Sequence, residues 1–339
     1  MKKGCVLGVL ILGLIFAGCS EKKPLLSEEG NVQQSSETTP YPTLAPDWSN
    51  WTDSDVSSSY GGAVNLWDKE DTVFGEWTVI TGDTVEAKFV YRWDLDQYKE
   101  YGEAKTVTIV TVNDNVCEFE LNGQPSENGV LSANKVMNQE TVESLLITDC
   151  TLKEGENKLG IHTAVYFPQI GHVMTSSLIR TFQAENGREQ TVTELCGTEE
   201  DLEFSITTSE GMDEREIKAE LTKGSDYYFQ QLSYDSSKRC TTIPQDGELG
   251  IELRNTGGSA GVTPVGREVL ILVLKNGELI LMQGDESVYL CELSEQELCR
   301  KIPLTVKGKP GEYAHVAFVY FDLSRDGSTF WNERLFYFQ

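Results

Sequence analysis

The chain has 339 residues, with 54 acidic against 28 basic side chains and a formal net charge of −26 at pH 7. Proteins bind nucleic acid and acidic lipid surfaces largely through Lys and Arg, so this charge argues against both as partners. At ~150 residues per domain, the length predicts two domains, each large enough to bury its own hydrophobic core.

The N-terminus has the features of a lipoprotein leader. Two lysines follow Met1, and Val6–Ala17 is a nearly uninterrupted apolar run, too short to span a hydrocarbon core of ~30 Å. The run ends in Ala17-Gly18-Cys19, which resembles the lipobox of bacterial lipoproteins. This resemblance implies that residues 1–18 are a signal peptide and that Cys19 becomes the lipidated first residue. A plain secretory signal or an uncleaved anchor is the alternative.

Residues 19–46 are predicted to form the lipidated cysteine and a flexible tether. The segment is rich in Pro, Ser, Thr and Glu and has few large apolar side chains, so it cannot bury enough surface to fold. A tether of this length has an r.m.s. span of about 30 Å. We therefore expect an extracytoplasmic protein that stands away from a bacterial membrane, with the lipid bilayer as the partner of acylated Cys19.

Past residue 46 the hydrophobic pattern is typical of short β-strands. Asn276-Gly277 lies between two apolar runs and predicts a tight hairpin. Helical periodicity is weak, and 294–300 is the best candidate for one or two helical turns. Many short strands separated by turn residues predict an all-β sandwich or barrel. The clearest strand candidates are 106–112, 117–121, 251–253, 269–274, 278–282 and 316–321.

An internal repeat organises these strands. The segment that begins at Lys105 matches the segment that begins at Arg267, and two later pairs of segments follow in the same order at a similar offset. This order predicts a duplication of one strand-rich unit. The strand spacing resembles the immunoglobulin-like sandwiches that bacterial surface proteins use in tandem. The resemblance implies two antiparallel β-sandwich domains, 47–186 and 187–339.

The six cysteines beyond Cys19 allow disulfides in an exported protein. Cys117–Cys150 and Cys291–Cys299 are the most plausible pairs within the predicted domains. Cys117 and Cys150 also lie on apolar strand faces, so free thiols buried in a core are the alternative. The cysteine and histidine spacings do not predict a zinc site.

Catalytic motifs have little support. Gly257-Gly-Ser259-Ala-Gly261 matches a nucleophile elbow, but a strand instead of a helix follows it, so we interpret the motif as a loop between strands. The three histidines are scattered without a metal-ligand spacing. Asp94 and Asp96 are one carboxylate pair among many and do not by themselves predict glycoside hydrolysis. We therefore expect a protein that is not an enzyme.

One segment has the residue pattern of a calcium loop. Asp322, Ser324, Asp326 and Gly327 match positions 1, 3, 5 and 6 of an EF-hand-type loop, and Glu333 matches position 12. Calcium prefers oxygen ligands of this kind, so it is the one cofactor that the sequence suggests. Strands are predicted on both sides of the segment, and an ordinary hairpin with an Asp-Gly tip is the alternative.

Five of the six tryptophans cluster near the start of the predicted folded part. Aromatic faces among Asp and Asn side chains suit sugar rings. Four of these residues are therefore candidate ligand-binding residues: Trp48, Trp51, Trp67 and Trp77. Burial in a sandwich core is the alternative for the same side chains.

These patterns together predict a bacterial cell-surface lipoprotein whose two sandwiches form a non-catalytic binding or structural module. The expected partners beyond the bilayer are a protein or a glycan at the cell surface. A carbohydrate-binding protein that uses the tryptophan-rich edge is one alternative. An extracellular glycan hydrolase is the other.

Overall fold

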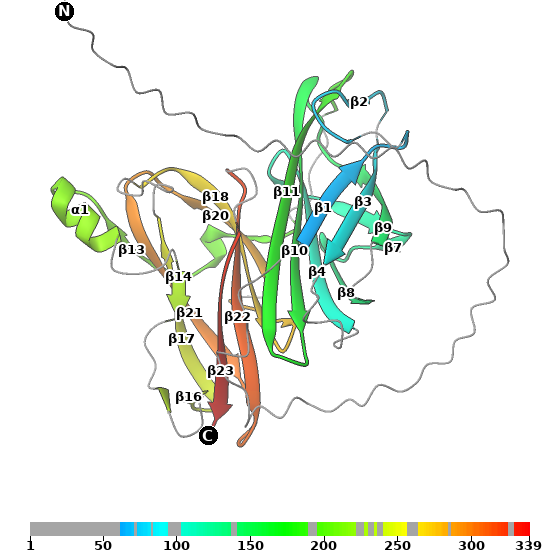
Figure 1. Ribbon diagram of the computed structural model, residues 1–339. Coiled ribbons are helices and arrows are strands. Elements are labelled where there is room, and N and C mark those ends of the chain that lie inside the picture. Colours follow the sequence, from blue (N-terminus) through cyan, green and yellow to red (C-terminus); the bar gives the residue numbers. More distant parts are fainter. Residues whose placement is uncertain are drawn as a thin grey trace, which may run out of the picture. The chain divides into compact units, whose positions relative to one another are not determined.

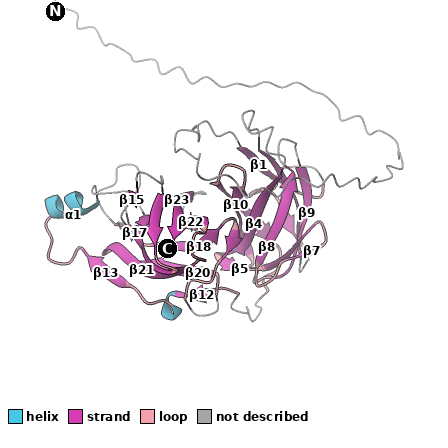
Figure 2. Cartoon of the chain, turned by 90° about the horizontal axis from the view of Figure 1, so that it is seen from below, coloured by secondary structure: helices cyan, strands magenta, loops and turns pink. Residues whose placement is uncertain are grey.

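The described elements are almost all β-strands, which form four sheets (Figure 1). Figure 2 shows how strongly strands predominate, and the predicted all-β fold is confirmed. The predicted leader, Cys19 and tether lie outside the described residues, as do Trp48, Trp51, Asp94, Asp96 and the loop 257–261. The computed structural model describes residues 62–70, 73–82, 84–93, 103–136, 141–188, 195–221, 227–229, 234–235, 240–255, 264–283, 286–324 and 329–339.

Two sheets lie within residues 62–184. In chain order their strands are β1 Gly62–Trp67, β2 Val79–Ile80, β3 Val85–Trp93, β4 Glu103–Val112, β5 Asn115–Val116, β6 Glu118–Leu121, β7 Gln124–Pro125, β8 Val130–Val136, β9 Thr141–Asp149, β10 Gly155–Phe167 and β11 His172–Ala184. One sheet has the order β1-β3-β9-β6-β7, and the other has the order β2-β11-β10-β4-β5, with β8 also paired to β4. Side chains of both sheets share one core, which makes them the first sandwich.

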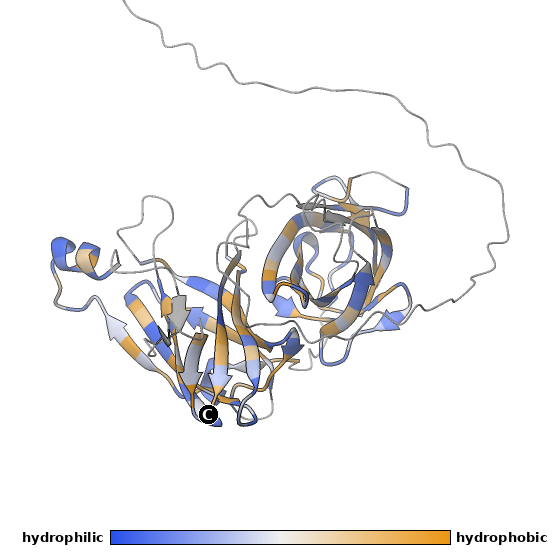
Figure 3. Ribbon diagram, turned by 60° about the horizontal axis from the view of Figure 1, so that its bottom comes forward, coloured by the Kyte–Doolittle hydropathy of each residue, from blue (hydrophilic) through white to orange (hydrophobic). Residues whose placement is uncertain are grey.

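The other two sheets lie within residues 197–338. Their strands are β12 Gly197–Thr198, β13 Ser205–Thr208, β14 Tyr227–Phe229, β15 Tyr234–Asp235, β16 Cys240–Ile243, β17 Asp246–Arg254, β18 Arg267–Lys275, β19 Glu278–Leu279, β20 Val288–Leu293, β21 Glu297–Lys307, β22 Tyr313–Asp322 and β23 Thr329–Phe338. The orders are β12-β20-β18-β22-β23-β16-β15, with β19 on β18, and β13-β21-β17-β14. A second core joins these sheets into the second sandwich. Helix α1, Glu214–Leu221, was not predicted and is mostly hydrophilic (Figure 3).

The two sandwiches share part of their strand order. In the first, the chain passes from β1 to β2 in the opposite sheet and returns to β3; in the second, it passes from β14 through β16 to β17. β2 pairs in parallel with β11, and β16 pairs in parallel with β23. The order β11-β10-β4 corresponds to β23-β22-β18. This shared order is what a duplication would produce. The exact domain boundary at 186/187 stays a prediction.

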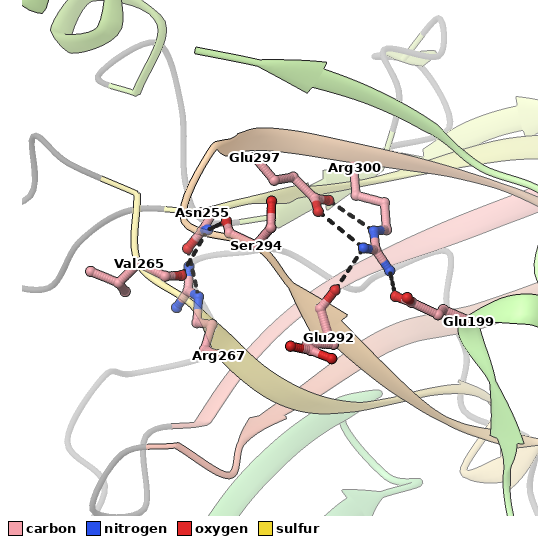
Figure 4. A network of polar contacts seen from close by, with 8 residues as sticks. All are labelled: Glu199, Asn255, Val265, Arg267, Glu292, Ser294, Glu297 and Arg300. Carbon is pink, nitrogen blue, oxygen red and sulfur yellow. Dashed lines mark hydrogen bonds and ion pairs between the residues drawn. The ribbon is translucent and has the colours of Figure 1, made fainter. Parts of the chain in front are cut away.

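The predicted helix at 294–300 is wrong. The backbone N–H of Glu297 donates to Ser294 O at 3.1 Å to close a turn, and β21 begins at the same residue. Arg300 Nε donates to Glu297 Oε1 at 2.8 Å, and its Nη1 donates to Glu199 Oε2 at 2.8 Å (Figure 4). Glu297 and Arg300 are three residues apart, a spacing that would place them on one face of a helix. In the structure the same two residues form a buried ion pair at the start of β21.

Alternate side chains of β18 enter two different cores. Val269, Ile271 and Val273 pack inside the second sandwich. The intervening side chains pack in a third core with side chains of β4, β10 and β11 from the first sandwich: Leu270, Leu272 and Leu274. The sheet that holds β4, β10 and β11 therefore packs against the sheet that holds β18, β22 and β23, within the compact unit Leu44–Gln339. We call this contact the inter-sandwich interface.

The predicted hairpin at Asn276-Gly277 closes one part of this interface. Antiparallel pairing of β18 with β19 confirms the hairpin. Both turn residues have positive φ, as a type I′ turn requires. A Cβ atom on Gly277 would lie 2.3 Å from Cδ1 of Tyr166 in the first sandwich, so a side chain here must displace that ring. Lys105 Nζ donates to Asn276 O at 3.3 Å and joins the two sandwiches further.

Candidate functional site

The three histidines of the chain all lie at the inter-sandwich interface. His162 is in β10, His172 begins β11 and His315 is in β22. Their exposed fractions are 0%, 2% and 1%. Their spacing along the chain did not show this, because the sheets that carry them meet only through the packing of the two sandwiches.

The carboxylate of Glu333 in β23 connects this interface electrostatically. His172 Nδ1 lies 2.5 Å from Glu333 Oε1, and the Val173 N–H donates to Oε2 at 2.8 Å. His315 Nε2 lies 3.4 Å from the same Oε2. Burial alone raises the pKa of Glu333, but the hydrogen bonds from His172 and His315 outweigh burial and bring it to about 2. An ionised carboxylate of the second sandwich thus binds β11 of the first.

His162 has a different environment on the same interface. Its Nε2 lies 3.1 Å from Thr111 Oγ1 and its Nδ1 lies 2.6 Å from Ser177 Oγ. The ring centroid is 5.3 Å from that of Phe321 in the second sandwich. Burial, with a smaller effect from Lys158, lowers the pKa of His162 to about 3. This ring is neutral at physiological pH, and like the other two it is sealed from solvent, so the cluster serves cohesion.

The tryptophans predicted to bind a ligand differ in placement. Trp77 is 87% exposed, and Trp67 in β1 is half-buried. Trp48 and Trp51 lie outside the described residues, so the predicted grouping of all four stays a prediction. Burial, the alternative for these side chains, is wrong for Trp77.

Trp77 is one of three exposed apolar side chains that are close together in the sequence. Val73 is 56% exposed and Val79 is 50% exposed. We call Val73, Trp77 and Val79 the Trp77 edge. Phe74, between them in sequence, is 0% exposed, and its ring centroid lies 5.5 Å from that of Phe182 in the first core. One aromatic ring therefore anchors the segment while the next one faces water.

The turn that carries Trp77 is held by hydrogen bonds. The Gly75 N–H donates to Thr78 Oγ1 at 3.0 Å, and the Thr78 N–H donates to Gly75 O at 2.8 Å. Gln183 of β11 donates its N–H to Thr78 O at 2.9 Å. The Thr78 side chain is buried at 8% exposure, whereas its neighbour Trp77 is not. The backbone presents the indole from a defined position.

A small hollow adjoins the Trp77 edge. Its volume is about 190 Å³, and Val79 and Thr78 line it next to Trp77. The rest of the lining is mainly polar and comes from the β1 end, the β2 strand and the start of β3. Its carboxylate and hydroxyl side chains are those of Asp68, Glu70, Glu86, Thr78, Thr81 and Thr84.

A larger hollow, about 510 Å³, lies over β17 and β21 and includes three carboxylates. Glu203 and Glu248 are exposed. Glu252 is 5% exposed and pairs with Arg254. Its Oε1 accepts hydrogen bonds from Arg254 Nη2 and Cys299 Sγ, so the protein's own donors already occupy this carboxylate. This hollow therefore does not favour the hydrolase alternative.

Two residues of the predicted calcium loop, Asp322 and Glu333, lie far apart. In the register of β22 and β23, the cross-strand partner of Glu333 lies five residues before Asp322, which is about 17 Å along a strand. Asp322 is fully buried, and its Oδ2 lies 3.4 Å from Arg267 Nη1. Ser324 Oγ accepts a backbone N–H, and Asp326 lies outside the described residues. This geometry contradicts the predicted calcium site in which Asp322 and Glu333 bind the same ion.

The four cysteines of the predicted disulfides are free thiols, so the structure does not contain those pairs: Cys117, Cys150, Cys291 and Cys299. Cys117 and Cys150 lie in the first core, where burial raises their pKa values to about 12 and about 11. Cys299 Sγ donates to Glu252 at 3.3 Å, and Cys291 lies on a strand of the opposite sheet. The alternative of buried protonated thiols describes these residues.

No family model matches the chain, and no curated protein matches it. Among solved structures, the AgI/II polypeptide BspA C-terminal domain of Streptococcus agalactiae is 8% identical, covers 82% of this chain and 100% of its own, and has a TM-score of 0.24. The Escherichia coli chaperone DraB is 11% identical over 80% of this chain and 96% of its own, at a TM-score of 0.24. The CooA pilin subunit of enterotoxigenic E. coli is 10% identical over 36% of this chain and 99% of its own, at 0.22. TM-scores this low carry no argument about function.

Among the described residues, no helix has the length and apolar character needed to cross a membrane.

Proposed function

We propose that this protein is an exported, lipid-anchored bacterial surface protein that acts by binding. The observation that carries the proposal is the Trp77 edge, where Val73, Trp77 and Val79 stay exposed on a turn that buried Phe74 anchors. An apolar edge in water costs free energy unless a partner covers it, and exposed aromatic side chains are common contact residues. The edge therefore favours a contact site for a surface protein or glycan.

The polar chemistry of the chain supports a structural role for the rest of the molecule. Each histidine, the side chain that most often performs acid–base catalysis, is held in the inter-sandwich interface. Glu333, whose ionised form is stabilised there, contacts both sandwiches. The two sandwiches thus supply a scaffold on which the Trp77 edge is displayed.

Export and anchoring are supported by the leader pattern, in which Ala17-Gly18-Cys19 ends an apolar run. Mass spectrometry of the protein from bacterial membranes tests this part. We expect the mature chain to begin at a diacylated Cys19, and we expect Cys19→Ala to leave the membrane fraction. Cys150→Ala is the matched control, because that thiol is buried in the fold. A mature N-terminus at any other residue would contradict the anchoring.

Binding is tested with the detergent-solubilised full chain on immobilised extracellular proteins and glycans. Trp77→Ala should weaken the bound signal at least tenfold. Leu281→Ala removes a similarly exposed apolar side chain elsewhere, since Leu281 is 53% exposed, and it should leave the signal unchanged. Equal signals from the two variants would refute the Trp77 edge as the contact site.

A further inference from the structure

We propose that the Trp77 edge and the adjoining hollow bind a neutral pyranose ring of a glycan. This inference rests on the proposed function and names the ligand class of the same site. Four properties of the site lead to it: a flat exposed ring, polar groups in the hollow that the next two residues, Thr78 and Val79, help to line, the sign of the local charge, and a fixed backbone.

The indole of Trp77 supplies the stacking surface. With 87% of the residue exposed, a face of the ring is available to a ligand. A pyranose presents axial C–H groups on one face, and these carry a partial positive charge that the negative π-face of an indole attracts. Val73 and Val79, which flank Trp77 in the sequence, add two more exposed apolar side chains to the same segment.

The hollow supplies groups for the sugar hydroxyls. Its volume of about 190 Å³ is below the range of about 300–1,000 Å³ that suits drug-sized ligands, so it fits a single ring. Carboxylates accept hydrogen bonds from sugar hydroxyls, and threonine hydroxyls both donate and accept. Asp68, Glu70 and Glu86 provide the first kind of group, and Thr81 and Thr84 provide the second.

The local charge selects neutral sugars. Among the described residues, the hollow is lined by the carboxylates of Asp68, Glu70 and Glu86 and by the ammonium group of Lys69, which lies 4.0 Å from Glu70 Oε1. The ammonium group of Lys88 lies close by, 3.5 Å from Lys69 O, so the acidic groups still outnumber the basic ones. Glu76 stands next to Trp77 in the same turn and is exposed. A uronate, sulfate or phosphate group brought here meets like charge, which raises its free energy and slows its approach. The same charge disfavours an anionic lipid surface as the occupant.

The fixed backbone lowers the cost of binding. Gly75 and Gln183 both hydrogen-bond to Thr78, and Phe74 is locked in the first core. Because the turn is already ordered, a weak ligand loses little affinity to loop ordering. A disordered loop that carried the indole would lose conformational entropy on each binding event, and this loss would weaken the affinity.

The test uses glycan arrays and tryptophan fluorescence with the detergent-solubilised full chain. Neutral hexose polymers should bind saturably, and sulfated and uronate polymers should bind at least tenfold more weakly. Trp77→Ala should reduce neutral-glycan binding at least tenfold, and Trp77→Phe, which keeps an aromatic face, should retain most of it. Leu281→Ala is the control, and an unchanged melting temperature shows that each variant is folded.

The outcomes separate this inference from the proposed function. Neutral-glycan binding that survives Trp77→Ala, or a preference for acidic glycans, overturns the inference. Binding of an extracellular protein that is lost in Trp77→Ala, without any glycan binding, overturns the glycan and keeps the contact site. Absence of both kinds of binding overturns the proposed function as well.

Discussion

The environment of Glu333 determines what this carboxylate does. A buried charge is costly unless donors surround it, and here two imidazoles and one backbone N–H do so. The donors come from both sandwiches, because His172 and Val173 belong to the first and His315 belongs to the second. One side chain therefore serves both the fold of β23 and the cohesion of the interface.

Glu333→Gln tests this role. The amide keeps the shape but removes the charge, so the free energy of unfolding should fall by about 3 kcal/mol. Urea unfolding at neutral pH measures the change. Glu278→Gln is the control, because Glu278 also pairs across the interface, with Lys105, but its side chain is 67% exposed. An exposed pair is worth about 0–1 kcal/mol, so a Glu278 effect as large as that of Glu333 would contradict the assignment.

His162 should make the protein sensitive to acid. Its pKa is lowered from 6.5 to about 3 in the folded state, so the unfolded state binds the proton more readily. The stability from the neutral ring is complete above pH 6.5 and is lost as pH falls toward 3, by up to about 1.4 kcal/mol per pH unit. Glu333 adds a loss only between pH 4.5 and about 2, as its carboxylate becomes protonated.

The measurement is urea unfolding of the wild type and His162→Gln at pH 7, 6, 5 and 4. The variant keeps a hydrogen-bonding side chain beside Thr111 and Ser177 but has no titrating ring. The wild type should lose stability steeply between pH 6 and 4, and the variant should lose less. Parallel curves for the two proteins would show that His162 is not the group responsible.

At the scale of elements, two Asn-Gly turns offer a matched comparison. Gly277 and Gly123 have similar backbone angles, with φ of +79° and +73°. A Cβ at Gly277 meets the ring of Tyr166, whereas a Cβ at Gly123 meets nothing within 4 Å. The two positions therefore share the backbone strain of a left-handed residue and differ in contact across the interface.

Gly123→Ala should cost about 1 kcal/mol from strain alone, and Gly277→Ala should cost about 1–3 kcal/mol more because the added methyl group displaces a packed ring. Thermal and urea unfolding of both variants measure the difference. Equal losses would mean that the β18–β19 hairpin does not press on the first sandwich.

Hairpins and strands were predictable because their signals are local. Asn276-Gly277 and the β-branched runs specify a turn and strands without reference to other parts of the chain. The inter-sandwich interface also has a signal in the sequence. The run Val269–Leu274 is apolar at every position, which is the pattern of a strand buried on both faces. A strand with one face in water alternates instead.

The candidate site was predictable only in part. The residue type at Trp77 suggested a ligand contact. Its exposure was not predictable, because it depends on which aromatic residue of the segment enters the core, and that residue is Phe74. The calcium pattern misled because Asp322 and Glu333 are close in sequence yet lie far apart along paired strands. The histidines looked unrelated for the opposite reason, since packing of sheets brings β10, β11 and β22 together.

At the scale of the whole molecule, the inter-sandwich interface should make the two sandwiches unfold together. The third core contains fully buried side chains from both, such as Ile109 of β4 and Leu272 of β18. Separation of the sandwiches would expose these apolar surfaces, at ~25 cal/mol per Å². We therefore expect the full chain to unfold in a single calorimetric transition, even though each sandwich has its own core.

Leu272→Asp tests the coupling, because it places an unpaired charge in the third core and leaves the other two cores intact. We expect two separate calorimetric transitions for this variant, with the β-sheet signal in circular dichroism retained at low temperature. Leu281→Asp makes the same chemical change at a residue that is 53% exposed, and its single transition should persist. A single transition in both variants would mean that the third core is not what couples the sandwiches. Two transitions in the wild type would mean that the sandwiches are independent. In that case Glu333 and the histidines would hold together two bodies that do not need each other to fold.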